Sequence, residues 1–190
     1  MIISFFEEFP RKANLNKLSL IDFPTKLYLA AHSVEQFKKL KQQITNKHVK
    51  EIIFWPIFKK ESGYWFSPFT KRKALKKLFQ ELKGTSIPVM LDLELPTRPH
   101  PSLYLTELHN FIINKKLITN FIKSHKKVYL CSYFTDLNIL NLLGVQYSNK
   151  LKHYQIKMAY SSCYDHGEKS IDSKIKQQQK LYNNKFILAF

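Results

Sequence analysis

The stretch Pro88-Val-Met-Leu-Asp-Leu-Glu-Leu-Pro96 has the apolar pattern of a buried strand but carries two carboxylates, Asp92 and Glu94. A buried carboxylate without a partner costs several kcal/mol, or its pKa shifts until the group is neutral. Residues two apart on a strand point to the same side, so both carboxylates are expected on one face. The stretch therefore predicts a buried strand that ends in a pair of acidic side chains.

Six other short apolar runs resemble this one and are separated by amphipathic segments. The seven expected strands are 2–6, 26–31, 51–55, 88–93, 127–131, 155–160 and 185–190. Such continuous apolar runs are typical of parallel strands that are covered on both faces. The expected helices are 33–44, 70–82, 103–124, 136–143 and 168–182.

Polar residues and glycines mark several helix ends. Ser33, with Gln36 three residues later, forms a capping-box pattern, and Thr70 is expected to cap the next helix. Gly84 and Gly144 follow the ends of two expected helices. Within 103–124, the side chains of one helical stripe are expected to face inward: Leu105, Leu108, Ile112, Phe121 and Ile122.

Alternation of strand and helix predicts right-handed βαβ units and a parallel sheet, so we expect one α/β domain over residues 1–190. The spacing favours a (β/α)8 TIM-barrel-like fold. An open parallel α/β sheet is the alternative, but no glycine-rich turn follows the first strand. The seven strands leave the barrel apparently incomplete, lacking the last βα unit. We therefore expect a fragment of a longer barrel, a partner chain or oligomer that completes it, or an open variant.

The chain has a net charge of +17, with lysine supplying nearly all of the positive charge and arginine only at Arg11, Arg72 and Arg98. A basic balance suggests nucleic acid, an anionic membrane or an anionic substrate as a partner. Nucleic-acid readers usually rely on arginine, so a nucleic-acid partner is not favoured, and the lysines are expected on solvated helix faces.

No apolar run approaches the about 18 residues that span a membrane, and the N-terminus lacks the pattern of a signal peptide. Cys131 and Cys163 show no CxxC or Cys/His ligand spacing. They are expected to be reduced, buried side chains of a cytoplasmic protein. The seven histidines show no metal-ligand spacing, so neither a metal nor a cofactor is expected.

Acidic and aromatic residues gather at the expected carboxyl ends of the strands, where barrels carry their chemistry. Asp92 and Glu94 are the candidate catalytic pair, because neighbouring carboxylates split their pKa values into an acid and an ionised partner. Glycoside hydrolysis uses such pairs, and aromatic rings stack on sugars. The candidate substrate-binding residues are Glu7, Glu8, Trp55, Tyr133, Tyr160, Tyr164 and Asp165.

The "MLDLE" of the fourth strand and the "KMAY" of the sixth resemble the chitinase-type glycoside hydrolases of family eighteen, which are (β/α)8 barrels. In that family the fourth strand ends D-x-x-D-x-D-x-E and the sixth carries M-x-Y-D. The resemblance implies that Glu94 protonates the glycosidic oxygen. It also implies that Asp92 orients the N-acetyl nucleophile of the substrate and that Tyr160 hydrogen-bonds to that group.

The sequence departs from the family pattern at Ile87, Met90 and Ser161, where the family has aspartates. The lysozyme-like barrels of family twenty-five are a second similarity, with D-x-E on strand four. We therefore expect a carbohydrate-active hydrolase that cleaves O-glycosidic bonds. The alternatives are a non-catalytic or truncated barrel that binds a carbohydrate or another small polar ligand, and a basic nucleic-acid-associated accessory protein.

Overall fold

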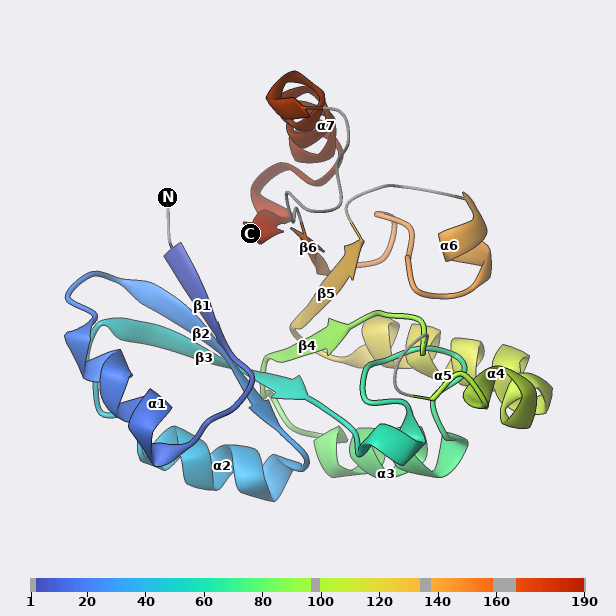
Figure 1. Ribbon diagram of the computed structural model, residues 1–190, viewed down its shortest axis with the longest axis horizontal. Helices are drawn as coiled ribbons and strands as arrows, with labels where there is room; N and C mark the ends of the chain where they lie inside the picture. The colour runs from blue at the N-terminus through green and yellow to red at the C-terminus, as the bar shows by residue number, and fades with distance from the viewer. Residues whose placement is uncertain (1–2, 97–99, 134–137, 159–166, 190) are drawn as a thin grey trace.

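The computed structural model describes residues 3–96, 100–133, 138–158 and 167–189. Its centre is a parallel sheet of seven strands in sequential order, and the sheet curls into a half-barrel (Figure 1). All seven expected strands are present, with bounds shifted by no more than a few residues. They are β1 Ile3–Glu7, β2 Thr25–Ala31, β3 Val49–Pro56, β4 Val89–Asp92, β5 Val128–Tyr133, β6 Tyr154–Met158 and β7 Phe186–Ala189.

Helices connect the strands, as the alternating pattern predicted. The α-helices are α1 Lys12–Lys17, α2 Val34–Gln42, α3 Arg72–Leu82, α4 Leu103–Thr106, α5 Phe111–Ser124, α6 Asn138–Leu142 and α7 Gly167–Tyr182. Short 3-10 turns are η1 Leu18–Leu20, η2 Lys60–Ser62, η3 Leu108–Asn110 and η5 Asn183–Lys185. Helices α1, α2, α3 and α5 lie along the outer side of the curled sheet (Figure 1).

The two faces of the sheet bury different side chains because successive strand residues alternate between them. On the outer face, Leu29 of β2 and Leu91 of β4 join a cluster with residues of α1, α2, α3 and α5. On the inner face, Tyr28, Met90 and Tyr129 join a second cluster of strand residues. This alternation places the even-numbered residues of β4, including Asp92, on the inner face.

Sequential strand order with helices over the outer face lacks the reversal that marks a doubly wound sheet. The edge strands are β1 and β7, and no pairing joins them within the described residues. The architecture is therefore an open, curled parallel α/β sheet.

Strands β3 and β4 separate toward their carboxyl ends, since only one residue pair, Phe54 with Val89, joins them. Beyond it, the loop after β3 returns and lies beside β4. Phe66 N–H donates to the Asp92 carbonyl over 2.8 Å, and Glu94 N–H donates to the Phe66 carbonyl over 3.0 Å. This loop thus fills the gap between the two strands beside the candidate catalytic pair.

The structure corrects the expectation of one long helix over 103–124. The chain forms α4, then η3, then α5, so the helical stripe is not continuous. Leu105, Leu108 and Ile112, expected to face inward, are 81%, 60% and 77% exposed. Phe121 and Ile122, near the end of α5, are buried as expected.

Two expected helix starts have different outcomes. The Ser33 hydroxyl accepts the Gln36 N–H over 3.1 Å, which confirms the cap of α2. Thr70 does not cap α3, which begins at Arg72 without a side-chain cap. Instead, the buried Thr70 hydroxyl donates to the Trp65 carbonyl and accepts the Ser67 N–H, so it stabilises the loop before α3.

Candidate active site

Asp92 lies at the end of β4 on the inner face and is 4% exposed. Its Oδ1 atom has no hydrogen-bond partner among the described residues. Burial raises the pKa of Asp92 well above its usual range, and the nearby carboxylates of Glu94 and Glu8 raise it further. The Cys131 thiol and the Trp55 indole offset only part of this shift. Burial therefore favours the protonated form of the Asp92 carboxyl.

Glu94 follows β4 and is half-buried, with its backbone fixed by the hydrogen bond to Phe66. Burial, followed by the charge of Glu8, raises the pKa of the Glu94 carboxyl to about 7. A group with this pKa is present in both protonation states near neutral pH, as a general acid or base requires.

Glu8 enters the same region from the end of β1 and lines a pocket there. Its Oε1 accepts a 2.7 Å hydrogen bond from the hydroxyl of Tyr64. Tyr64 has a φ of 58°, which bulky residues rarely adopt, and it follows Gly63 with a φ of 121°. This conformation turns the Tyr64 ring toward the inner cluster, whereas Phe66 packs in the outer one.

Three further inner-face residues surround the carboxylates. Trp55 of β3 is buried, and its indole lies near enough to Asp92 to lower the pKa of that carboxyl, although its Nε1 forms no hydrogen bond of normal geometry within the described part of the chain. Cys131 of β5 pairs in register with Asp92, and burial together with Asp92 raises the pKa of its thiol. Tyr133 ends β5, where burial and Glu94 raise the pKa of its phenol to about 12.

The other predicted site residues lie elsewhere or outside the described residues. The Glu7 carboxylate accepts hydrogen bonds from the Phe9 N–H and the Asn14 side chain, which keeps it in the turn before α1. Glu7 and Glu8 point in opposite directions because they are adjacent on a strand end. Tyr160, Tyr164 and Asp165 lie outside the described residues, as does Ser161.

None of Glu8, Asp92 and Glu94 forms an ion pair in the part of the chain that the structure describes. The inner-face ion pairs lie instead at the opposite end of the strands, where Glu51 contacts both Lys26 and Lys127. Although the chain has a net charge of +17, no ion pair within the described ranges neutralises Glu8, Asp92 or Glu94.

A pocket of about 600 Å³ opens above the ends of β1, β2 and β3. Glu8 and Tyr64 are half-buried in its wall, while Arg11, Lys59 and Lys60 are exposed. His32 lines the same pocket and is fixed by a 3.0 Å contact between its Nδ1 and the Ile57 carbonyl. The Glu8 carboxylate is therefore reachable from solvent through a defined cavity.

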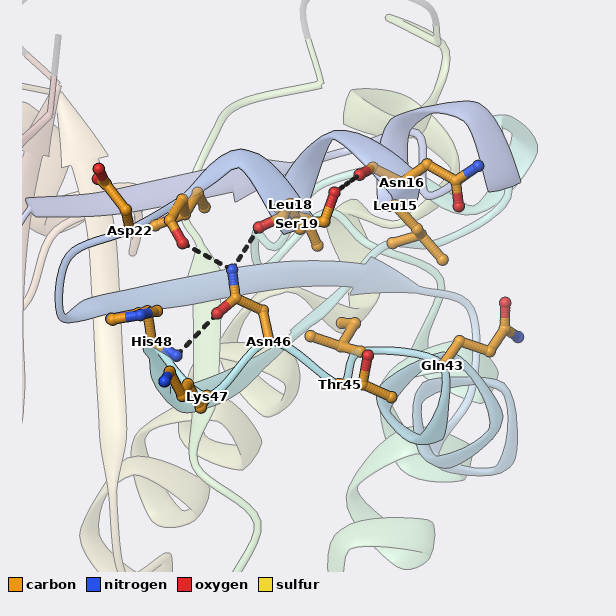
Figure 2. A pocket seen from close by; sticks show the side chains of 12 residues that line it. Leu15, Asn16, Leu18, Ser19, Asp22, Gln43, Thr45, Asn46, Lys47 and His48 are labelled. Atoms are coloured by element: carbon orange, nitrogen blue, oxygen red, sulfur yellow. Dashed lines mark hydrogen bonds between the residues drawn. The ribbon is translucent and has the colours of Figure 1, made fainter.

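A second pocket, of about 530 Å³, lies at the opposite end of β2 and β3, between η1 and the loop before β3 (Figure 2). The Asn46 amide donates to the carbonyls of Leu18 and Ile21, and its Oδ1 accepts the His48 N–H (Figure 2). These bonds tie the two loops together. The polar groups of this pocket thus serve to fix the backbone.

Among the described residues, no three His, Cys, Asp or Glu side chains are grouped as metal ligands would be. None of the described helices is long and apolar enough to cross a membrane. No protein-family model matches the chain, and neither the curated proteins nor the solved structures include a match to it.

Sequence reasoning did not single out Tyr64 or the three exposed cations of the 600 Å³ pocket, Arg11, Lys59 and Lys60. Tyr64 belongs to an aromatic stretch that gave no reason to prefer one ring over another. Gly63 immediately before it was the available signal, because glycine often marks a backbone that turns sharply. Arg11, Lys59 and Lys60 resemble the many other basic residues of the chain in sequence, and only the fold brings them to one pocket.

Proposed function

We propose that this protein is a carbohydrate-active hydrolase that cleaves O-glycosidic bonds by carboxylate acid/base chemistry, with Glu94 as the general acid. The observation that carries the proposal is the half-buried Glu94 carboxyl, whose pKa is raised to about 7 beside the carboxylates of Glu8 and Asp92. The resemblance of the fourth strand to family eighteen assigns the same role to Glu94.

In this mechanism the protonated Glu94 gives its proton to the glycosidic oxygen while the bond from that oxygen to the anomeric carbon breaks. Positive charge develops on the sugar ring, and a second carboxylate stabilises it or activates the incoming water. We assign this role to Glu8, which lines the open pocket and is oriented by Tyr64. Asp92, whose pKa burial raises, positions the reacting groups by hydrogen bonding.

The proposed function goes together with a barrel-like plan of the fold. We infer that the curled sheet has the plan of a (β/α)8 barrel, with the site at the carboxyl ends of its strands. Sequential strand order and the helices on the outer face support this plan. The neutral, buried Cys131 thiol is compatible with the reducing cytoplasm.

The test is hydrolysis of reducing-end-labelled chitin-type and peptidoglycan-type oligosaccharides by the wild type and by Glu94→Gln. Loss of at least about 100-fold in kcat is expected, because the variant cannot donate a proton. Glu35→Gln on the exposed surface of α2 is the control that removes a distant glutamate and should keep wild-type turnover. Circular dichroism establishes that both variants are folded.

Undiminished turnover by Glu94→Gln overturns the assignment of the acid. If the folded wild type binds these oligosaccharides without cleaving them, the non-catalytic binding barrel replaces the hydrolase.

A further inference from the structure

The pocket beside Glu8 has two electrostatic layers. Its half-buried wall carries the Glu8 carboxylate and the Tyr64 hydroxyl, which are hydrogen-bonded to each other. Its exposed part carries Arg11 from the loop after β1 and Lys59 and Lys60 from the loop after β3. Negative charge thus lies inside and positive charge lies outside, at the same opening.

The three cations are not used to neutralise the carboxylates of the site. None of Arg11, Lys59 and Lys60 forms an ion pair within the described ranges, and neither do Glu8, Asp92 and Glu94. Glu61 is the acidic residue that accompanies them in the exposed part of the pocket. Cations that surround an opening without an internal partner are free to contact a ligand.

The opening continues beyond this pocket. An adjoining cavity of about 330 Å³ shares His32, Ile57, Phe58 and Lys59 with it and extends to Lys77 of α3. Two cavities that share a wall offer room for a ligand longer than one sugar ring. The cations Lys59 and Lys77 lie along this extension, together with Glu81, whose carboxylate accepts the Val34 N–H.

We infer that the substrate is an anionic glycan whose acidic groups contact Arg11, Lys59 and Lys60 while a neutral sugar ring lies over the carboxylate of Glu8. The choice of a glycan rests on the proposed hydrolase function. A neutral glycan would leave the three cations unused, and a cationic one would be repelled by them and by the net charge of +17.

The spacing of charge favours a glycan over a nucleic acid. A nucleic acid carries a phosphate at every nucleotide, so some phosphates would be forced close to the Glu8 carboxylate in the pocket wall. An acidic glycan carries its charges on side groups and leaves its glycosidic oxygens uncharged. Its charges can therefore remain at the rim while a glycosidic bond enters the acidic interior.

The test measures binding of four probes of similar length: a hyaluronan oligosaccharide with carboxylates, a chondroitin sulfate oligosaccharide, a chitin oligosaccharide without charge, and a single-stranded RNA. The rim variant is Arg11→Gln/Lys59→Gln/Lys60→Gln. The control variant is Lys116→Gln/Lys123→Gln/Lys126→Gln, which removes the same charge from exposed lysines on and after α5.

The wild type is expected to bind the acidic glycans more tightly than the neutral one. The rim variant should bind them about tenfold more weakly, because each exposed charge contact contributes modestly. Its affinity for the neutral glycan and the affinities of the control variant should change less than twofold. A stronger effect on hyaluronan or on chondroitin sulfate identifies the carboxylate or the sulfate as the recognised group.

Equal weakening in the control variant overturns the inference, because net charge alone would then explain binding. Tighter rim-dependent binding of RNA overturns it in favour of a nucleic-acid surface. Failure of this inference and failure of the hydrolase are distinguishable. If the wild type cleaves the neutral glycan and the rim variant binds the acidic glycans as tightly as the wild type, only the inference of an anionic substrate is overturned. If the rim variant binds the acidic glycans more weakly but the wild type does not cleave them, only the proposed hydrolase function is overturned.

Discussion

The Tyr64 hydroxyl donates a 2.7 Å hydrogen bond to the carboxylate of Glu8, although 56 residues separate them in the chain. This bond joins the loop after β3 to the end of β1 at the open pocket. Because the Tyr64 backbone is held at a φ of 58°, the contact is maintained against local backbone preference. Such strain is typical of sites where a side chain must be held in one direction.

Tyr64→Phe tests this contact. The variant keeps the ring but loses the hydroxyl, so the Glu8 carboxylate loses its hydrogen-bond donor. We expect a loss of about 0.5–2 kcal/mol in the free energy of unfolding, measured by chemical denaturation. We also expect kcat to fall more than KM changes if Glu8 must be oriented for the reaction. Wild-type stability together with wild-type kcat would contradict a positioning role.

Glu8→Gln is expected to lower the pKa of Glu94. The charge of Glu8 raises the pKa of the Glu94 carboxyl to about 7 together with burial, and glutamine removes the charge while keeping the shape. The measurement is a carboxyl carbon NMR titration of Glu94 in both proteins. An unchanged Glu94 pKa would show that the two carboxylates do not interact.

Glu94→Gln should make the protein more stable at alkaline pH. The folded pKa of about 7 exceeds the unfolded value of 4.5, so the folded state binds more protons between these pH values. The stability that the protonated Glu94 carboxyl contributes is therefore fully present below the unfolded pKa, and it is lost as the pH rises through about 7. At pH 8 the variant should gain about 1–3 kcal/mol over the wild type.

At pH 4 the two proteins should unfold at nearly the same denaturant concentration, because Glu94 is then protonated in both the folded and the unfolded state to a similar extent. If the free energies of unfolding of the two proteins differed equally at pH 4 and at pH 8, the pKa of Glu94 would not be raised in the folded state. A variant that is inactive yet more stable at pH 8 is the pattern expected for a catalytic carboxylate.

Two glycines provide a matched test of the fold. Gly144 has a φ of 69°, and a Cβ there would lie 2.6 Å from Pro68 Cγ. Gly84 has a similar φ of 74°, but a Cβ there would have no atom within 4 Å. Both alanine substitutions carry the strain of a left-handed conformation, about 1 kcal/mol. Gly144→Ala should lose about 1–2 kcal/mol more, because the segment after α6 must move away from Pro68.

The measurement is the free energy of unfolding of both variants under identical conditions. Equal losses would mean that the segment after α6 does not pack against Pro68 as the structure shows it.

The strands were predictable because a parallel sheet buried on both faces requires continuous apolar runs, and those runs are visible in the sequence. The error at 103–124 has an equally local cause. Leu105, Leu108 and Ile112 repeat at helical spacing, and periodicity alone does not reveal that the chain breaks at η3 and leaves them exposed. Thr70 was misjudged because its hydroxyl serves a turn that forms only around Trp65 and Ser67.

The sequence by itself determined the strand–helix alternation, the parallel sheet and the position of Asp92 and Glu94 at the end of its fourth strand. Strand alternation is local, so it also determined that these two carboxylates share a face. The tertiary structure decided which other groups meet them. Curling of the sheet brings Glu8, which follows β1, near β4, and the loop after β3 fills the gap between β3 and β4.

The sequence of Pro88–Pro96 therefore predicts where the two carboxylates lie, but not why their pKa values are raised. The raised pKa of Asp92 comes from burial and from Glu94 and Glu8, and that of Glu94 from burial and Glu8. Burial and charge–charge distances are properties of the folded chain, because they depend on residues far apart in sequence. The same reason explains why the cations at the pocket rim were indistinguishable from other lysines and arginines until the fold placed them together.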